Sequence, residues 1–499
     1  MYSMNIKNNK GTILIISYLV IAVLLILSAA FLSRSISENR IAERQKWSVR
    51  AFSIAEAGLE RALYDLRQDF KNDLIDPSWA DGEINGIACG PDSENFYSLP
   101  YESTLLGNGS YSIELKNVVG KDNEIWVRSM GTLNGINIII QSYGKIENLS
   151  PWNNAIFAGA GSAGSMINGN VDIRGSVHIL GTGLESDDFA IDMGGSGNIG
   201  NNYEGIPLQL KDRIPPCPTT TFNGETVETL GASLRIKRGL VGLSGTATTG
   251  KADVSGNSYK ETMDGVYVTD GYGGNRGENN VYSDNGTQNS YDLGDSARFP
   301  SLEDPYLNYS TYQDYLKDNA FVISDAANLN QLANITPESD FSYGDTMGSI
   351  SMDGNGNLAI SGTVYIDGGN LNMNKIGADK TIIYSGTGSI LVTGDVGINV
   401  NLLTQGSNSF PSNILGIMTP NEISFNASNI DVMGVFYAED TITVQKQTNI
   451  AGIIVSNYFN MGEQVPSIYQ VPEVINNLPS GIIAGDPTWV IRIVAWQKL

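Results

Sequence analysis

The sequence predicts two kinds of fold in one chain. The first is α+β: a long N-terminal transmembrane and amphipathic helix followed by a small antiparallel meander. The second is all-β: a right-handed parallel β-helix (solenoid) with long loop insertions. Three observations carry this prediction. An uncharged apolar run spans Thr12–Leu32, helical periodicity continues to Phe70, and glycines recur 18 residues apart near the end of the chain.

The apolar run is long enough to cross a membrane. Thr12–Leu32 holds 21 residues without a charge, and a helix of that length measures about 31 Å, close to the hydrocarbon thickness of a bilayer. The apolar region of a secretory signal is usually shorter, about 7–15 residues. Ser28, Ala29 and Ala30 have the small side chains of a signal-peptidase site, so a removed signal peptide is the alternative.

The helix is predicted to continue well beyond the apolar run. No proline or helix-ending glycine interrupts it before Phe70, and Arg61 and Asp65 have the spacing of an i,i+4 pair. Its apolar residues lie three or four apart, on one helix face: Phe52, Ala55, Leu59, Ala62, Leu63, Leu66 and Phe70. Residues 12–70 would then form one rod of about 88 Å, a retained anchor with a stalk. The basic residues on the two flanks leave the orientation in the membrane open.

Composition restricts the function classes. The chain has 499 residues, enough for two or three domains, and its 56 glycines with only 17% charged residues indicate a turn-rich β protein. The net charge of −23 argues against nucleic-acid binding and against adhesion of the soluble part to anionic lipid. The same charge could attract divalent cations.

A small antiparallel sheet is predicted after the helix. Residues 109–120, 123–131 and 134–146 alternate or run apolar between turn residues. Asn134 and Gly135 separate two of these runs, which is a strong indication of a hairpin. Residues 71–150 are therefore expected to cover the apolar face of the helix.

The pattern of residues changes after about residue 150. The template Ile-x-Gly-x-Val-x-Ile occurs at 173–179 and 360–366, a variant of it occurs at 392–398, and Gly416, Gly434 and Gly452 follow at constant spacing. Such repeats indicate a β-solenoid over 151–200 and 347–460, because stacked repeats share one core. A β-sandwich is the alternative. Residues 201–346 are expected to be a loop-rich insertion and 461–499 a cap over the open solenoid end.

The loop-rich insertion is the expected place for recognition. It is rich in Gly, Asn, Asp, Ser and Tyr, and residues 304–320 are predicted to contain a short helix with Tyr306, Tyr309 and Tyr312 on one side. Long loops on a rigid scaffold often carry binding sites, and exposed tyrosines suit contact surfaces. A low-complexity spacer is the alternative.

Residues 5–146 resemble the prepilins of type IV pili and type II secretion. Lys7 and Lys10 form a short basic leader that ends at Gly11. Within the helix, the block Ala55, Glu56, Ala57 and Gly58 resembles the PilX N-terminal family of pilus assembly proteins, which are minor pilins.

The resemblance implies a leader at 1–11, a membrane and stalk helix at 12–70, and cleavage after Gly11 by prepilin peptidase, which leaves Thr12 as the mature N-terminus. It implies an inner-membrane protein with its bulk in the periplasm. The helix would pack against other pilins, and the protein would then reach the cell surface in a pilus. Major pilins have a glutamate where this chain has Ile16, which fits a pilus tip better than the repeating position.

Few residues suggest chemistry. Cys89 and Cys217 could form one disulfide outside the cytoplasm or remain two unrelated thiols, and the single histidine, His178, is interpreted as a strand side chain. A polysaccharide-active β-helix needs several aspartates, a histidine and a basic cluster, for which Asp187, Asp188 and the segment 235–237 are weak candidates. We therefore expect no enzymatic activity.

No cofactor is expected, although the segment "MDGNGNLAI" resembles the start of a calcium loop. Asp353, Asn355 and Asn357 alternate as calcium ligands would, but Leu358 and Val364 replace the glycine and glutamate that such a loop requires. A turn between two strands explains the segment equally well.

The sequence therefore predicts a structural minor pilin that presents a β-helical module outward. The alternatives are a pilus-tip adhesin, a polysaccharide-active enzyme, and a membrane-tethered scaffold similar to bactofilins.

Overall fold

The computed structural model describes residues 10–72, 78–160, 167–169, 171–185, 187–268, 278–286, 297–377, 380–444, 446–461, 466–483 and 489–499. The chain divides into two compact units: residues 1–147 together with 489–499, and residues 148–488. The first nine residues of the expected leader lie outside the described residues.

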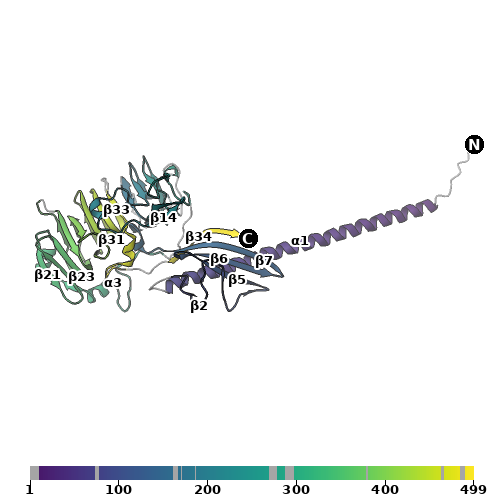
Figure 1. Ribbon diagram of the computed structural model, residues 1–499, viewed down its shortest axis with the longest axis horizontal. Coiled ribbons are helices and arrows are strands. Elements are labelled where there is room, and N and C mark those ends of the chain that lie inside the picture. The colour runs from purple at the N-terminus through teal and green to yellow at the C-terminus, as the bar shows by residue number, and fades with distance from the viewer. Residues whose placement is uncertain are drawn as a thin grey trace, which may run out of the picture. The chain divides into compact units, whose positions relative to one another are not determined.

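One helix dominates the first unit. Helix α1 (Lys10–Asn72) is continuous over 63 residues, about 95 Å at the usual rise per residue. Its first half extends beyond the sheet of this unit, and its second half lies on that sheet (Figure 1). The predicted rod is therefore present, with the apolar run and the amphipathic segment in one helix.

The second half of α1 is covered by the predicted antiparallel meander. Strands β5 (Gly109–Val118), β6 (Lys121–Leu133) and β7 (Ile136–Asn148) pair in sequence order. Asn134 and Gly135 both have positive φ, at 49° and 76°, as the two-residue turn between β6 and β7 requires. Short strands complete this region: β1 (Glu83–Ile84), β2 (Ile87–Ala88), β3 (Tyr97–Leu99) and β4 (Leu105–Leu106).

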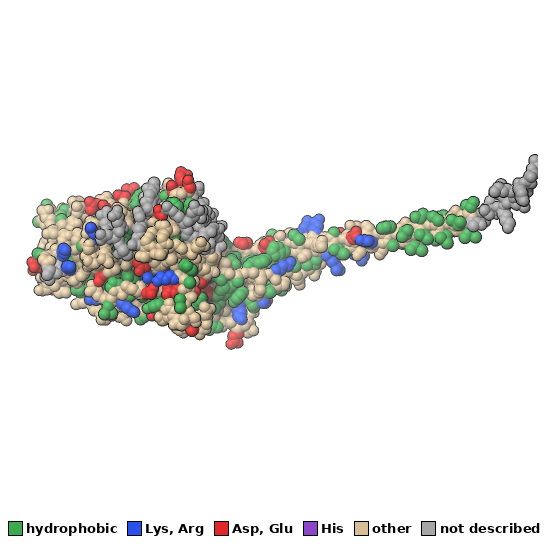
Figure 2. Space-filling view, turned by 90° about the horizontal axis from the view of Figure 1, so that it is seen from above, with side chains coloured by type: hydrophobic (Ala, Val, Ile, Leu, Met, Phe, Trp, Pro, Cys, Tyr) green, Lys and Arg blue, Asp and Glu red, His purple; other side chains and the backbone are tan. Residues whose placement is uncertain are grey.

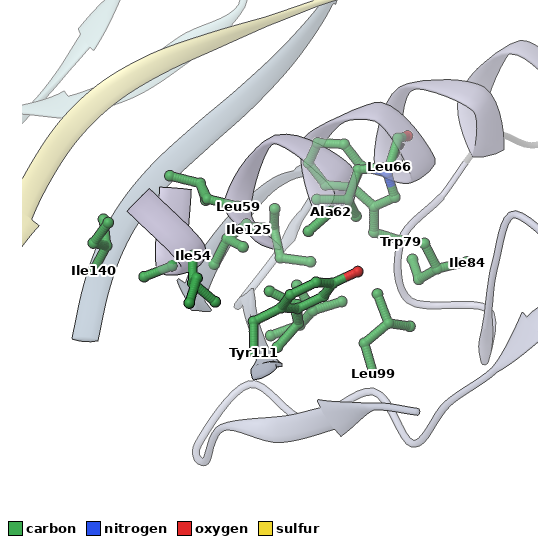
Figure 3. Close-up of a cluster of buried hydrophobic side chains, with 14 of the residues drawn as sticks. Ile54, Leu59, Ala62, Leu66, Trp79, Ile84, Leu99, Tyr111, Ile125 and Ile140 are labelled. Carbon is green, nitrogen blue, oxygen red and sulfur yellow. Dashed lines mark hydrogen bonds between the residues drawn. The ribbon is translucent and has the colours of Figure 1, made fainter. Parts of the chain in front are cut away.

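The core of the first unit lies between α1 and this sheet. Ile54, Leu59 and Leu66 of α1 point toward strand residues such as Ile125 (Figure 3). Trp79 is fully buried beside them, and its Nε1 donates a hydrogen bond to the Leu66 carbonyl oxygen at 2.9 Å. The predicted apolar face is confirmed, with Phe52 and Leu63 at its partly buried margin.

The segment that is expected to cap the solenoid behaves differently. Strand β34 (Trp489–Lys498) pairs with β7 and completes the sheet of the first unit, in the order β3-β5-β6-β7-β34. Strand β33 (Ser467–Tyr469) instead joins the second unit between two other strands. The second unit is thus an insertion between β7 and β34, which the apolar and proline pattern of 461–499 does not reveal.

Parallel pairing organises the second unit into three ladders. The first contains β20 (Phe321–Ile323), β23 (Asn357–Ile366), β26 (Thr387–Val392), β29 (Ile414–Thr419), β31 (Ile430–Val444), β32 (Thr448–Met461), β8 (Ile156–Ala160), β11 (Val177–Thr182), β16 (Ser233–Ile236) and β19 (Gly265–Val268).

The other two ladders share the long strands β31 and β32. The second also contains β24 (Leu371–Asn374), β27 (Val396–Asn399), β30 (Glu422–Phe425), β9 (Ile167–Gly169), β12 (Phe189–Met193) and β17 (Leu240–Leu243). The third also contains the start of β23, β25 (Thr381–Ser385), β28 (Asn401–Thr404), β33, β10 (Asp172–Arg174), β13 (Asn198–Gly200) and β18 (Thr248–Thr249).

The order of strands along the first ladder is not the order of the chain. Strand β32, near the end of the unit, pairs with β8, near its beginning. The two regions with repeat patterns, 151–200 and 347–460, are therefore adjacent across one ladder. The chain enters in the middle of the ladder, runs to β19 at one end, and continues from β20 at the other end.

The repeated glycines lie at bends and close contacts. Gly434 and Gly452 face each other in the pairing of β31 with β32, as the 18-residue period predicts, whereas Gly416 faces Val435, one position out of that register. Gly175 separates β10 from β11 and has φ 141°, and Gly394 separates β26 from β27. The Ile-x-Gly-x-Val-x-Ile template thus marks the place where the chain passes from one ladder to the next.

Four strands between residues 233 and 268 lie in the ladders, where the sequence pattern predicts loops. They are only two to four residues long, so their apolar alternation is weak. Asn223 and Gly224 form the turn of an antiparallel hairpin, β14 (Thr219–Phe222) and β15 (Glu225–Glu228), an Asn-Gly signal of the same kind as that at 134–135.

The remaining elements are short. Strand β21 (Asp340–Gly344) pairs antiparallel with β22 (Gly348–Asp353), and β22 pairs antiparallel with β23. The helices are α2 (Leu208–Lys211), α3 (Tyr312–Asp318) and α4 (Ala326–Leu332), with 3-10 turns η1 (Pro151–Asn153), η2 (Glu278–Asn280) and η3 (Pro472–Asn476). Helix α3 lies within residues 304–320, where a short helix is predicted, but it begins at Tyr312, so Tyr306 and Tyr309 lie before it.

Candidate assembly interface

The first half of α1 is an apolar surface that the described residues of its own unit leave uncovered. Every side chain from Ile13 to Leu32 is exposed, for example Ile16 at 56% and Phe31 at 69%. Figure 2 shows this hydrophobic stretch along the first half of the helix. Within the described residues, α1 is the one helix that is long and apolar enough to cross a membrane. An exposed apolar surface of this length is typical of a segment that a membrane or another protein covers.

A polar segment separates this surface from the sheet. Arg34 and Glu38 form an exposed pair at 2.9 Å, one helical turn apart, and such a pair contributes little to stability. The segment also carries Arg40, Arg44, Lys46 and Arg50, all exposed. Figure 2 shows basic side chains along this part of the helix. Ala51 is the first fully buried residue of α1, so the covered half of the helix begins there.

The Ala-Glu-Ala-Gly block lies where α1 is closest to the sheet. Ala55 is fully buried, and its carbonyl oxygen accepts a hydrogen bond from Ser129 Oγ at 2.7 Å. A β-carbon on Gly58 would lie 2.7 Å from the same Oγ and 2.8 Å from the Tyr111 ring. Glu56 is exposed and Ala57 half-buried. The small residues of the block therefore set the distance between helix and sheet.

The strand residue on the other side of this contact is also small. A β-carbon on Gly131 of β6 would lie 2.1 Å from the Ala51 carbonyl oxygen and 2.6 Å from the Ala55 backbone nitrogen. A larger residue would have to displace the backbone of α1 itself. The sequence alone does not single out Gly131, because its partner residues lie about 75 positions earlier in the chain.

A polar cluster holds the turn of α1 that follows the block. Arg61 donates to Tyr111 Oη and to the Ser103 carbonyl oxygen, both at 2.7 Å, and its guanidinium lies 3.9 Å from the centre of the Tyr101 ring. The hydrogen bond to Tyr111 raises the pKa of Arg61 above its usual value. Asp65 accepts from Tyr101 Oη at 2.8 Å, and the predicted Arg61–Asp65 pair is present at 4.0 Å. This half of α1 is thus held in a fixed position on the sheet.

The expected processing site lies at the start of α1. Gly11 and Thr12 belong to the backbone of this helix, which begins at Lys10. Cleavage between them stays a prediction, since nothing in the structure tests it.

Both cysteines are free thiols in this structure, and the disulfide considered from the sequence stays a prediction. Burial raises the pKa of Cys89, and it raises the pKa of Cys217 to about 12. Both thiols are therefore protonated at neutral pH and react slowly with thiol reagents. Cys89 belongs to the first unit and Cys217 to the second.

The segment considered for calcium is the turn between β22 and β23. The Asp353 carboxylate accepts hydrogen bonds from the backbone N–H groups of Asn355 and Asn357 and from the Asn357 side chain, at 2.7–3.1 Å. These bonds lower the pKa of Asp353 to about 2. Leu358 and Val364 belong to β23. The carboxylate thus has a structural role in this turn.

The residues considered for catalysis lie in strands and a turn of the second unit. His178 of β11 is fully buried, stacks edge-on against Phe157 at 5.1 Å, and has its pKa lowered to about 3 by burial. Arg235 lies in β16 opposite His178. The Asp188 carboxylate accepts a hydrogen bond from the Glu185 backbone within its own turn, next to Asp187.

Four tyrosines form a cluster on the second unit, and the three singled out from the sequence, Tyr306, Tyr309 and Tyr312, are among them. The rings of Tyr306, Tyr312 and Tyr315 lie 4.7–5.6 Å apart, and Tyr309 joins them at 5.5 Å from Tyr315. Leu307 between them is 76% exposed and has φ 51°. A leucine rarely adopts that backbone conformation, which costs about 1 kcal/mol or more.

Comparison with known proteins supports a pilin-like fold. The chain is similar to the crystal structure of the competence-associated pilin ComZ from Thermus thermophilus, with a TM-score of 0.53 and 21% sequence identity, over 91% of this chain and 97% of that chain. No protein-family model matches the chain, and no curated protein matches it.

At this identity the similarity shows the fold alone: a long N-terminal apolar helix followed by a large, mostly β body. The coarser part of the sequence-based resemblance, to pilins, is thus supported at the level of fold. Membership of the PilX N-terminal family is not confirmed.

Proposed function

We propose that this chain is a non-enzymatic minor pilin of a type IV pilus-like filament, of the kind with a PilX-like N-terminal domain. The continuity of α1 is the observation that carries the proposal. One helix has a first half that is apolar and exposed and a second half that is fixed on the sheet of its own unit. A helix of this kind can be held first by the membrane and later by the helices of neighbouring subunits without refolding.

In this proposal the leader is removed after Gly11 by prepilin peptidase, and Thr12 becomes the first residue. The segment Thr12–Leu32 anchors the protein in the inner membrane, with the bulk of the chain in the periplasm, and then packs among other pilin helices. Ile16 stands where major pilins carry a glutamate, so no buried carboxylate requires a partner amine. This favours a position at the filament tip, where no earlier subunit has to be matched.

The second unit would be the module that the filament presents outward. We propose that it forms a right-handed parallel β-helix, because three ladders of parallel strands share a core of aliphatic residues from successive strands. A rigid stack of this kind can present long surface segments at a distance from the membrane.

The mature N-terminus in cells with and without prepilin peptidase tests the proposal. We expect Thr12 as the first residue with the peptidase and an uncut leader without it, and the processed chain should be found in sheared filaments. A Gly11→Leu variant should stay uncut. An Ala30→Leu variant is the matched control, since it would block removal of a signal peptide. Cleavage near Ala30, sensitive to that control, would contradict the proposal.

A second candidate function, adhesion at the pilus tip, is favoured by the tyrosine cluster. Leu307 and Tyr306 are exposed on a turn whose backbone is unfavourable for leucine, and the nearby residues Glu303, Asp304 and Asp314 are acidic. Tyrosines are enriched among the residues that dominate binding, and strained backbone is concentrated at functional sites.

Replacing Leu307 by glycine and Tyr306 by alanine distinguishes the two functions. Loss of surface attachment with an unchanged number of pili would support an adhesin. Unchanged attachment would contradict the adhesin and leave assembly as the proposed function.

A further inference from the structure

Strand β34 is the edge strand of the first unit. Its ten residues, Trp489–Lys498, stand at one end of the sheet order β3-β5-β6-β7-β34, and among the described strands β34 pairs with β7 alone. In Figure 1 it runs beside β7, at the margin of the sheet that covers α1. One long side of β34 is therefore an open edge.

This edge is held in place by α1. Trp489 packs against Phe70 at 5.2 Å between ring centres, and Trp496 packs against Phe52 at 6.2 Å. The two helix residues lie about 27 Å apart along α1, and the two strand residues about 24 Å apart along β34. The strand thus follows the helix over its length and stays extended.

The hydrogen-bonding groups on the open edge can be assigned from one contact. The Leu499 backbone N–H donates to the Ile139 carbonyl oxygen of β7 at 3.0 Å. Since alternate residues of a strand direct their backbone groups to opposite sides, those of Lys498, Trp496 and Val494 face the open side. Regularly spaced N–H and C=O groups of this kind fit another extended strand.

The edge lacks the usual protection against such pairing. It contains no proline, Arg492 pairs with Glu147 at 3.3 Å, and the charge of Lys498 stands at the last residue of the strand, beside the Phe52 ring. Long edge strands normally carry charges, bulges or prolines that prevent association. An unprotected edge of ten residues is therefore expected to have a partner.

The side chains around the edge are apolar and exposed. Ile493 is 40% exposed, and Val494, Trp496 and Leu499 are each more than half exposed. Val49, 66% exposed, lies one turn before Phe52 on α1. The apolar surface therefore lies where the uncovered part of α1 begins, next to the segment that filament assembly would bury.

We propose that the open edge of β34 binds an extended strand of a neighbouring pilin-like subunit, which continues this sheet across the subunit boundary. That subunit is a different chain, because the tip position proposed from Ile16 is occupied by one copy. The inference rests on the proposed function, since it places the partner in the same filament. It adds which surface of the first unit is buried there and the kind of contact, backbone pairing, that joins the subunits.

Site-specific photo-crosslinking in filament-forming cells tests this. A photo-crosslinking residue replaces Gln497 in the full-length chain, and the same residue at Val119, a 79% exposed position in the turn between β5 and β6, is the control. We expect a crosslink from position 497 to another filament subunit, at least tenfold stronger than from position 119.

Proline then separates backbone pairing from mere proximity. Val494→Pro removes an N–H on the open edge and leaves the bonds to β7, so the crosslink should fall at least tenfold. Val494→Thr keeps the N–H and should keep at least half of the crosslink. Hydrogen exchange of β7 checks the fold. If the proline variant proves unfolded, Val494→Lys, an edge charge, should still lower the crosslink about fivefold.

The outcomes are distinct. A crosslink to a second copy of the chain, a crosslink to residues 148–488 of the same chain, or no crosslink from a chain that is present in sheared filaments would each overturn the inference and leave the proposed function standing. If the chain is absent from filaments altogether, both fail.

Discussion

The two units of this protein are built on different kinds of contact. In the first, a single helix lies on an antiparallel sheet, and the spacing between them is set by Ala55, Gly58 and Gly131. In the second, strand pairs with strand in parallel ladders, and equivalent residues such as Gly434 and Gly452 lie opposite each other. Small residues thus allow the close approach of a helix in the first unit and of a neighbouring strand in the second.

The two units should therefore differ in how far the effect of one substitution spreads. In the first, the close contacts join α1 to β5 and β6, about 50 to 80 residues later, so one oversized residue should displace a whole helix. In the second, each contact repeats in the next strand, so damage should be limited to the neighbouring strands. Substitutions at the close contacts test this contrast.

The largest effect is expected at Gly452 in the second unit. A β-carbon there would lie 1.9 Å from the Gly434 carbonyl oxygen, and Gly452 has φ 143°. Gly452→Val should therefore lower the local free energy of unfolding by about 4 kcal/mol, from a steric clash added to backbone strain. Hydrogen-exchange mass spectrometry of the full-length chain in detergent would measure this for peptides of β31 and β32.

Gly406→Val is the matched control. Gly406 also has positive φ, at 90°, but a β-carbon there meets nothing within 4 Å. This variant should lose only the strain part, about 1–3 kcal/mol. Equal losses in the two variants, or any loss in peptides of α1, would contradict the proposed contrast between the units.

A smaller loss is expected at Gly131 in the first unit. Gly131→Val would press on the Ala51 carbonyl oxygen, and overpacking of this kind costs about 3 kcal/mol. Protection should fall along the whole segment from Ala51 to Phe70, because α1 moves as one body. Thr132→Val, at the next residue of the same strand, should cost less than about 0.5 kcal/mol. Loss confined to β6 alone would count against this view of the first unit.

The elements of the first unit could largely be predicted from the sequence. The apolar positions of α1 repeat at the helical period, and Asn134-Gly135 fixes one hairpin, so each element is encoded locally. The return of β34 could not be predicted, since pairing with β7 depends on residues about 350 positions away. Proximity of Gly131 to Ala51 is hidden for the same reason.

For the second unit the sequence predicts strands better than their order. Glycine spacing indicates the pairing of β31 with β32. It does not predict the pairing of β32 with β8, because that contact joins residues about 300 positions apart. The short strands at 233–268 escape notice because two to four residues cannot establish a period. For the candidate interface, the exposed half of α1 follows from composition, whereas the open edge of β34 does not.

Acid should weaken the second unit through His178, the one histidine of the chain. Its pKa falls from about 6.5 when unfolded to about 3 when folded, because burial disfavours the charged form. The unfolded chain thus binds the extra proton first, and stability present above pH 6.5 is lost as the pH falls toward 3. Between pH 7 and pH 5 the loss is about 2 kcal/mol.

Hydrogen exchange of β11 at both pH values would measure this loss, and a His178→Val variant should show a slope that is smaller by that amount. The first unit contains no histidine, so protection in α1 should change little over the same range. An unchanged slope in the variant would mean that other groups cause the acid sensitivity.

The smallest effect tests whether Gly58 and Ser129 act together. Ser129 Oγ donates to the Ala55 carbonyl oxygen at 2.7 Å, and the buried bond contributes about 1 kcal/mol, which Ser129→Ala would remove.

Gly58→Ala would bring a methyl group to 2.7 Å from that Oγ and 2.8 Å from the Tyr111 ring, a clash of about 1–3 kcal/mol that is offset by about 1 kcal/mol of helix propensity. In the double variant the Oγ obstacle is gone and the Tyr111 ring remains. The two losses should therefore sum to at least about 0.5 kcal/mol more than the loss in the double variant. Strict additivity would mean that the ring alone requires glycine in the Ala-Glu-Ala-Gly block, and that Ser129 only closes a hydrogen bond.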